Sequence, residues 1–112
     1  NIMYNEALCL LYPSDYEGFG IPILEAQKAG CPVIAQNTSS VPEVIGNGEL
    51  LVSHDKTVRM ADAMADKVKQ LLSQPTQSII EKGMQNAKRF SWDKTYAQTK
   101  QVYEDIYYNH HL

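Results

Sequence analysis

A segment of about thirty residues near the start of the chain most limits the folds that this sequence can adopt. Residues 7–12 form an unbroken apolar run closed by Pro13, which is typical of a strand buried on both faces in a parallel sheet. Pro22 suits the first turn of a helix, and Gly30 suits the left-handed position just after one. A second apolar run at residues 32–36 predicts the next strand. Strand, helix and strand at this spacing predict a right-handed crossover unit of an α/β fold.

The rest of the chain continues this alternation and then becomes helical. We expect a short helix over residues 41–45 and a third strand over residues 50–52, which would complete a small parallel sheet. Beyond Asp55 the apolar spacing predicts three helices, the first ended by Pro75 and the last capped by Ser91.

Each of these three helices carries one apolar stripe that we expect to face a core. The first stripe consists of Ala61, Met64, Ala65, Val68, Leu71 and Leu72. The second, on a helix that begins at about residue 76, consists of Ile79, Ile80, Gly83, Met84, Ala87 and Phe90. The third consists of Trp92, Tyr96, Thr99, Tyr103 and Ile106. Because this last stripe is rich in Trp and Tyr, it would equally suit packing on a partner domain.

Composition and charge exclude several classes of protein. Ten Lys and Arg residues against thirteen Asp and Glu residues give a net charge of −3, so a nucleic-acid surface is not expected. The apolar runs are too short to span a bilayer and no secretory signal opens the chain, which predicts a cytoplasmic protein and leaves peripheral membrane association open. Two cysteines, Cys9 and Cys31, are too few for a disulfide framework. The chain begins with Asn1, so we expect a piece of a longer protein.

The residues most suited to chemistry gather in the loop that follows the first strand. Ligands of open α/β sheets bind beyond the carboxyl ends of the strands, where this loop begins. Its glycines, Gly18 and Gly20, let a ligand approach the backbone closely. The helix that follows starts with amides that lack intrahelical partners, and Pro22 removes one of them. The expected donors of a phosphate site are therefore the amides of Gly20, Ile21 and Ile23.

Two carboxylates, those of Glu17 and Glu25, lie beside this expected phosphate site and would repel an anion unless they face another group. The hydroxyls of a sugar or a ribose are suitable partners because a carboxylate accepts two or more strong hydrogen bonds. A plainer interpretation is that Glu25 pairs with Lys28 and that Glu17 is a solvated loop residue. The residues alone leave both interpretations open.

Five short blocks of sequence form a recognisable series. They read EGFGIPILE at residues 17–25, AGCPVIA at 29–35, SVPEVI at 40–45, GELLV at 48–52 and FSW at 90–92. The series resembles the retaining glycosyltransferases of family four, and the resemblance covers nearly the whole chain. It implies that residues 1–112 are part of the Rossmann-like, carboxyl-terminal donor domain of a two-domain GT-B glycosyltransferase, followed by carboxyl-terminal helices.

The resemblance also implies a role for each position of the first block. Glu17 would be the catalytic residue, in contact with the hydroxyls of the donor sugar, and Glu25 would bind the ribose of the nucleotide. The backbone between them would lie against the sugar and the diphosphate. These further donor-binding positions are Gly18, Phe19, Gly20 and Ile21. No metal or other cofactor is implied, and the chain lacks an Asp-x-Asp pair that would hold a cation.

The function implied by the resemblance is hexose transfer from a nucleoside diphosphate sugar, in polysaccharide or glycoconjugate synthesis. The partners would be the nucleotide-sugar donor, a carbohydrate or lipid-linked acceptor, and a missing amino-terminal domain on which residues 91–109 pack. The upstream Arg and Lys that bind the diphosphate in this family lie outside the chain, so we expect the chain alone to be inactive. The alternative is a non-catalytic nucleotide or nucleotide-sugar binding module of doubly wound type.

The remaining polar residues have simpler interpretations. His54 is expected in a loop, while His110 and His111 are expected at a frayed end rather than in a metal site. Three polar residues follow the second strand on the ligand side and are expected to approach the nucleotide: Ser39, Ser40 and Glu43.

Overall fold

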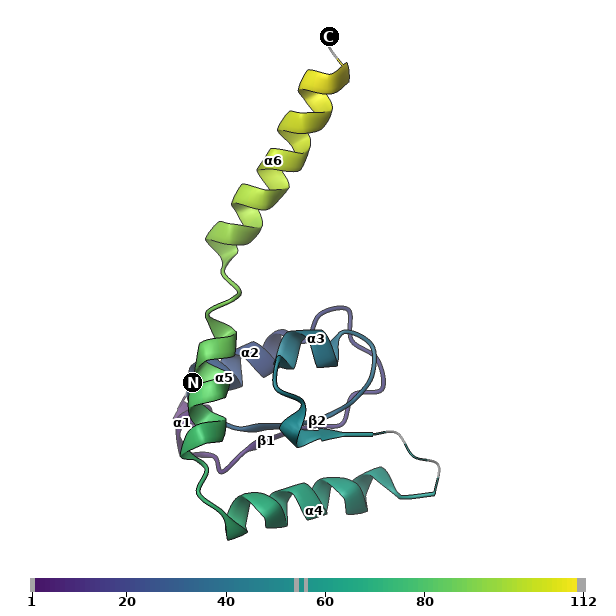
Figure 1. The fold of residues 1–112 in the computed structure, drawn as a ribbon, viewed down its shortest axis with the longest axis vertical. Coiled ribbons are helices and arrows are strands. Elements are labelled where there is room, and N and C mark those ends of the chain that lie inside the picture. The colour runs from purple at the N-terminus through teal and green to yellow at the C-terminus, as the bar shows by residue number, and fades with distance from the viewer. Residues whose placement is uncertain (1, 54, 56, 111–112) are drawn as a thin grey trace.

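The computed structural model describes residues 2–53, 55 and 57–110, which form an α/β body and one helix that extends away from it (Figure 1). The strands are β1 (Leu10–Tyr12), β2 (Val33–Gln36) and β3 (Leu51–Val52). The helices are α1 (Ile2–Glu6), α2 (Ile21–Lys28), α3 (Val41–Ile45), α4 (Met60–Ser73), α5 (Gln77–Ala87) and α6 (Trp92–His110). A 3-10 turn, Gly48–Leu50, leads into β3. The predicted His54 and His111 positions lie outside the described residues.

The three strands form one parallel sheet in the order β1-β2-β3, as the crossover unit predicts. Leu10 lies opposite Val33, and Ala35 lies opposite Leu51. The strand boundaries are shorter than predicted, because only the last half of the apolar run 7–12 pairs with β2. Gly30 has a φ of 78° just after α2, which confirms the predicted helix end.

The prediction that the first strand is buried on both faces is wrong. Leu11 is 48% exposed, whereas Ile34, its partner in β2, is fully buried. The reason is geometric: β1 is an edge strand, and α4 packs mainly under β2 and β3. In Figure 1, α2 and α3 cover one side of the sheet and α4 covers the other. All four residues of the central strand β2 are buried, so β2 lies at the centre of the core.

Two apolar clusters make up that core, one on each side of the sheet. The first lies between the sheet and the helices α2 and α3, and it includes Ile23, Ala26, Val33, Ala35 and Val41. The second lies between the sheet, α4 and α5, and it includes Ile34, Val52, Met64, Leu71 and Ile79. Each fully buried aliphatic side chain of this kind stabilises the fold by about 1.5–3 kcal/mol.

The predicted stripe on α4 is partly wrong. Ala61, Ala65 and Leu72 are exposed, and Leu72 is 68% exposed. The buried face keeps Met64, Val68 and Leu71 of the predicted stripe but is shifted to one side of it. It consists of Met64 and Leu71, with Met60, Ala63 and Val68 packed partly against them. On α5, Ile79 is buried as expected, but Met84 is 44% exposed.

The helix α6 does not pack on the body, so the expectation that its stripe faces a core within this chain is wrong. None of its described residues is buried, and Trp92 and Tyr103 are 78% and 73% exposed. Its predicted cap is confirmed, because the Lys94 amide donates to Ser91 Oγ at 3.1 Å. The helix instead projects freely from the end of α5, which leaves its aromatic face open (Figure 1).

A buried polar network joins three helices and was not predicted. The last three carbonyls of α3 are capped by side chains from α2, from α5 and from the link that follows α5. Arg89 Nη2 donates to the Glu43 carbonyl at 2.8 Å, Asn86 Nδ2 to Val44 at 2.8 Å, and Gln27 Nε2 to Ile45 at 2.9 Å. Asn86 also donates to Gln27 Oε1 at 2.7 Å and accepts from Arg89 Nε at 2.8 Å. We call these three capping side chains the α3 cap.

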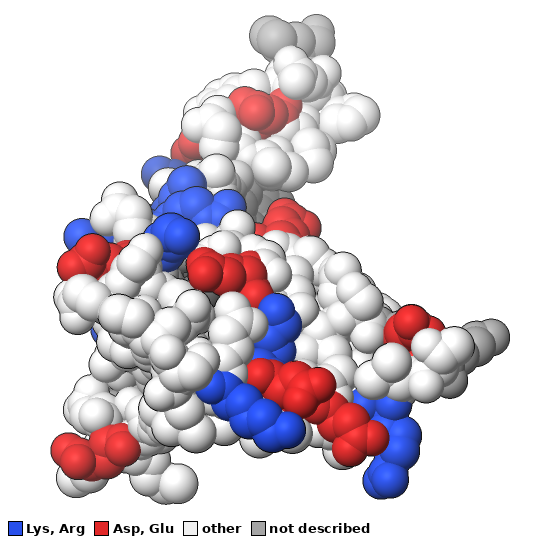
Figure 2. Space-filling model, turned by 60° about the horizontal axis from the view of Figure 1, so that its bottom comes forward, with Lys and Arg blue, Asp and Glu red and all other residues white. Residues whose placement is uncertain are grey.

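The surface carries mixed charge. Figure 2 shows Lys and Arg side chains interspersed with Asp and Glu on the face that it presents. Lys82 Nζ lies 3.4 Å from Glu49 Oε2, and Lys67 Nζ donates to the Glu49 carbonyl at 2.9 Å. Within the described part of the chain, no helix is long and apolar enough to cross a membrane.

Candidate functional site

The candidate site lies where two loops meet at the carboxyl edge of the sheet. One loop, residues 13–20, runs from β1 to α2 and is called the donor loop below, after the donor-binding role that the family resemblance implies for it. The other, residues 37–40, runs from β2 to α3. The two loops lie side by side because parallel strands end at the same edge of a sheet. Thr38 Oγ1 donates to the Asp15 carbonyl at 3.1 Å, which is one of four hydrogen bonds between the loops.

Glu17 is held through its backbone by two serines of the second loop. Its amide donates to Ser39 Oγ at 3.0 Å, and its carbonyl accepts from Ser40 Oγ at 3.0 Å. The Glu17 side chain is half-buried, and hydrogen bonds from Tyr12 and Ser14 lower the pKa of its carboxyl group. The hydrogen bonds hold the Glu17 backbone in a defined place and favour the ionised form of its carboxyl group.

Tyr12, the last residue of β1, is the partner of Glu17 that the sequence reasoning missed. Burial, followed by the hydrogen bond to the Glu17 carboxylate and the charge of that group, raises the pKa of Tyr12 to about 12. The phenol thus remains a neutral donor over the whole physiological range. An aromatic hydroxyl at the end of a strand that leads into an acidic loop is the only signal of this pair in the sequence.

The tip of the donor loop presents open backbone. A Cβ placed on Gly18 would meet nothing within 4 Å, and Gly18 is exposed. Gly20 has a φ of 100°, in the left-handed region, and a Cβ there would lie 3.2 Å from Ile23 Cδ1. Glycine is therefore required at position 20 by conformation, whereas at position 18 its small size leaves room for a ligand.

The amino end of α2 offers fewer free amides than predicted. The Ile23 amide donates to the Gly20 carbonyl at 3.0 Å, so the expectation that Ile23 serves a phosphate is wrong. This bond is of the 3-10 type that tightens the first turn of a helix. The amides of Gly20 and Ile21 have no hydrogen-bond acceptor among the described residues, and they remain the candidate phosphate donors.

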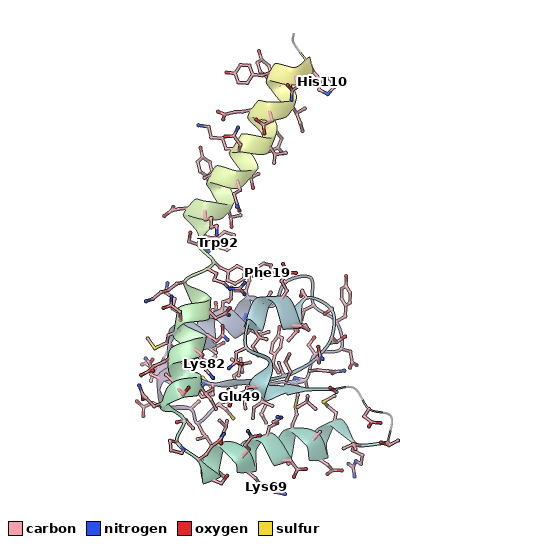
Figure 3. All side chains as sticks on the ribbon, viewed as in Figure 1. Phe19, Glu49, Lys69, Lys82, Trp92 and His110 are labelled. Carbon is pink, nitrogen blue, oxygen red and sulfur yellow. The ribbon has the colours of Figure 1, made fainter. Side chains whose placement is uncertain are left out.

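Phe19 closes one side of the loop against the end of α5. Its ring meets the ring of Phe90 edge to face, with the centroids 5.6 Å apart, and Arg89 lies 4.8 Å from the Phe90 ring centroid. Figure 3 shows Phe19 beside the start of α6, which is marked by Trp92. The side chain of Phe19 is still 44% exposed, so one face of the ring is open.

Glu25 lies on α2, one turn beyond the donor loop, and its side chain is exposed. Tyr4 Oη donates to Glu25 Oε2 at a long distance of 3.4 Å. Glu25 and Lys28, both within the described residues, form no ion pair, so the plainer interpretation of Glu25 is not supported. The contact of Glu25 with a ligand stays a prediction.

The remaining polar residues take other positions. Ser39 and Ser40 contact the donor loop, and Glu43 offers its backbone carbonyl to Arg89, so their approach to a nucleotide stays a prediction. His110 is an exposed residue at the end of α6. Among the residues that the structure describes, no three His, Cys, Asp or Glu side chains gather in a group that could hold a metal ion.

Comparison with known proteins assigns the family. The family model for glycosyl transferases group 1 matches residues 1–95, which contain the whole α/β body. The chain belongs to the group 1 glycosyltransferases. The matched region ends within the first turn of α6, so most of that exposed helix lies beyond it.

Individual relatives of this group 1 glycosyltransferase chain carry transferase names. The chain is 38% identical over 104 residues to O-antigen chain mannosyltransferase B of Escherichia coli, covering 91% of the chain and 26% of that protein. It is 34% identical over 114 residues to D-inositol 3-phosphate glycosyltransferase of Corynebacterium glutamicum, covering 98% and 26%. It is 35% identical over 103 residues to the MMP alpha-(1->4)-mannosyltransferase of Mycolicibacterium hassiacum, covering 88% and 24%. The chain spans about a quarter of the length of these relatives.

Proposed function

We infer that this chain is the donor-binding part of a retaining glycosyltransferase that moves a hexose from a nucleoside diphosphate sugar to an acceptor. The observation that supports this most directly is the arrangement of residues 17–21. Two serine hydroxyls hold the backbone of Glu17, and the amides of Gly20 and Ile21 have no acceptor among the described residues. A carboxylate next to an anion site suits a ligand that carries both hydroxyls and a diphosphate. The mannosyltransferase names of two relatives support a hexose, and mannose in particular.

In this proposal each part of the site has one task. The Gly20 and Ile21 amides, together with the positive end of the α2 dipole, receive the diphosphate and stabilise its charge as it leaves, without a divalent cation. Glu17 accepts hydrogen bonds from the donor sugar near the carbon where positive charge develops. Glu25, farther along α2, accepts hydrogen bonds from the ribose. The acceptor is a carbohydrate or a lipid-linked carbohydrate in polysaccharide or glycoconjugate synthesis.

Two substitutions in the full-length enzyme test these roles. Glu17→Gln is expected to lower kcat by about 100-fold or more, with nearly unchanged affinity for the free nucleoside diphosphate. Glu25→Gln is expected to weaken donor and free nucleotide alike by about 1.5–3 kcal/mol, because a charged hydrogen bond is lost. Glu6→Gln, at an exposed position on α1, is the matched control.

The measurements are calorimetry and steady-state rates with a panel of nucleoside diphosphate sugars that includes GDP-mannose and UDP-glucose. Unchanged nucleotide affinity in the Glu25 variant would reject its ribose role, and an unimpaired rate in the Glu17 variant would reject the sugar contact. Donor binding by the full-length protein without turnover would favour the non-catalytic binding module. The anomeric configuration of the product, read by NMR, tests retention.

The exposed aromatic face of α6 has a place in the same proposal. We infer that it packs on an amino-terminal domain supplied by the rest of the protein, because the chain spans only about a quarter of its relatives. A soluble domain rarely leaves so many large aromatic side chains uncovered. The apolar and aromatic residues that would be covered include Trp92, Tyr96, Val102, Tyr103 and Ile106. Hydrogen exchange of α6 should be slower in the full-length protein than in the isolated chain, and equal rates would contradict the packing.

A further inference from the structure

Ser40 makes an unusual set of contacts for a residue in its position. It is the residue that precedes α3, where serine ordinarily accepts a hydrogen bond from an amide of the first helical turn. The Ser40 side chain makes no such capping bond. Its hydroxyl lies 3.0 Å from the Glu17 carbonyl oxygen and 2.9 Å from the Phe19 carbonyl oxygen. The hydroxyl of Ser40 is therefore directed toward the donor loop instead of its own helix.

A single hydroxyl proton serves both carbonyls, which makes this a three-centre hydrogen bond. The two carbonyls belong to residues on either side of Gly18, so both must turn toward Ser40 at once. In a planar trans peptide, the carbonyl of one residue and the amide of the next point in opposite directions. The amides of Gly18 and Gly20 consequently point away from Ser40, on the opposite side of the loop backbone.

Those two amides have no acceptor among the described residues. Around Gly18 the space is open, since a Cβ there would meet nothing within 4 Å. The neighbouring Ser39 completes the arrangement by accepting from the Glu17 amide at 3.0 Å, and it does so in a left-handed conformation with a φ of 46°. A non-glycine residue at such a φ is uncommon and is retained where surrounding contacts hold it.

The anchor of this arrangement is rigid. Ser40 stands at the amino end of α3, and the carbonyls at the other end of that helix are bound by the α3 cap. Val41 and Val44 of α3 are buried in the core. A hydroxyl fixed in this way can define the path of the donor loop, and catalysis depends on such accurate placement of the reacting groups.

We propose that Ser40 is a positioning residue of the transferase: its hydroxyl gathers the Glu17 and Phe19 carbonyls, and thereby places the Glu17 carboxylate at the donor sugar and turns the Gly18 and Gly20 amides toward the donor. This inference rests on the proposed function. It assigns Ser40 no contact with the substrate, since the hydroxyl proton is already shared between two protein carbonyls.

Four variants of the full-length enzyme test the proposal: Ser40→Ala, Ser40→Thr, Ser40→Val and, as a control, Ser78→Ala. Ser78 is an exposed serine on α5. Thr and Val have nearly the same size, so their comparison isolates the hydroxyl. The rate of hydrolysis or transfer is measured with GDP-mannose and UDP-glucose, together with the affinity for the free nucleoside diphosphate and the midpoint of urea unfolding.

We expect Ser40→Ala and Ser40→Val to lower kcat by about 10–100-fold, the size of loss that follows from a misplaced catalytic group. Ser40→Thr should retain kcat within about threefold of the wild type, because the hydroxyl is kept. Affinity for the free nucleotide should change less than kcat, since Glu25 holds the ribose from α2. If Ser40→Ala fails to fold, the Thr and Val variants decide the question.

Equal kcat in the Thr and Val variants, or a wild-type kcat in the Ala variant, would overturn the proposal. A loss of kcat in the Ala and Val variants that tracks their loss of unfolding midpoint, with no rescue by Thr, would also overturn it. Glu17→Gln in the same assay separates this failure from failure of the proposed function. An impaired Glu17 variant beside an active Ser40→Ala variant rejects only the positioning role, whereas an active Glu17 variant rejects the site itself.

Discussion

Removing the side chain of Asn86 should destabilise the fold far more than its polar character suggests. Asn86→Ala breaks two hydrogen bonds to buried groups, the Gln27 Oε1 atom at 2.7 Å and the Val44 carbonyl at 2.8 Å. Each buried group left without a partner costs about 1–3 kcal/mol, so the expected loss for the two groups is about 2–6 kcal/mol. The third bond, from Arg89 Nε, adds little because exposed Arg89 can be hydrated instead. Urea unfolding of the variant measures the loss.

Two further variants make this prediction decisive. Gln85→Ala, at the neighbouring exposed position of α5, should change the free energy of unfolding by no more than about 0.5 kcal/mol. Asn86→Asp keeps the size of the side chain but places an oxygen where an amide donated to the Val44 carbonyl, so it should also be destabilising. A loss below about 1 kcal/mol in both Asn86 variants would refute the reasoning, because the network would then contribute no more than a surface contact.

Four other substitutions have expected outcomes of different kinds. Gly20→Ala should destabilise the protein by about 1–2 kcal/mol in thermal unfolding because position 20 is left-handed, whereas Gly18→Ala should leave stability unchanged. Tyr12→Phe removes the largest cause of the lowered Glu17 pKa, so the acidic limb of the pH–rate profile of the full-length enzyme should move to higher pH. Ile34→Ala, at a fully buried position in the central strand, should cost about 2–5 kcal/mol in urea unfolding.

The direction in which stability changes with pH follows from the direction in which the pKa of Glu17 is shifted. A lowered pKa of Glu17 contributes stability that is present above the pKa of the unfolded chain and is lost as the pH falls through the folded value. Tyr12→Phe should therefore also reduce the stability gained by ionising Glu17. An unchanged acidic limb would show that Tyr12 does not govern this carboxylate. Equal stability of the Gly18 and Gly20 variants would contradict the conformational argument for position 20.

The sheet and the helices were predictable because their signals are local. The apolar runs, Pro22 and Gly30 specify strand, helix and strand within one short segment, and the parallel pairing follows from the crossover. The rotation of the α4 stripe was not predictable in the same way. That helix places small or apolar residues such as Ala61 and Ala63 on more than one face, so spacing alone does not identify the buried one.

The exposure of Leu11 and of α6 depends on what packs against them, which periodicity does not reveal. The contacts of the candidate site are even less local. Ser39 and Ser40 meet the donor loop across 22 and 23 positions of sequence. The sequence shows two hydroxyls after a strand, but which carbonyls they reach depends on how the two loops cross at the sheet edge. Asn86 was missed for the same reason, since its partners lie 42 and 59 positions away.

The ring contact between Phe19 and Phe90 connects the donor loop to a segment outside the α/β body. Phe90 belongs to the short link between α5 and α6, directly before Ser91 caps the long helix. Because Phe90 lies in this link, a change in the direction of α6 would move the Phe90 ring relative to the Phe19 ring. The Phe19–Phe90 contact thus links the orientation of α6 to the loop that carries Glu17.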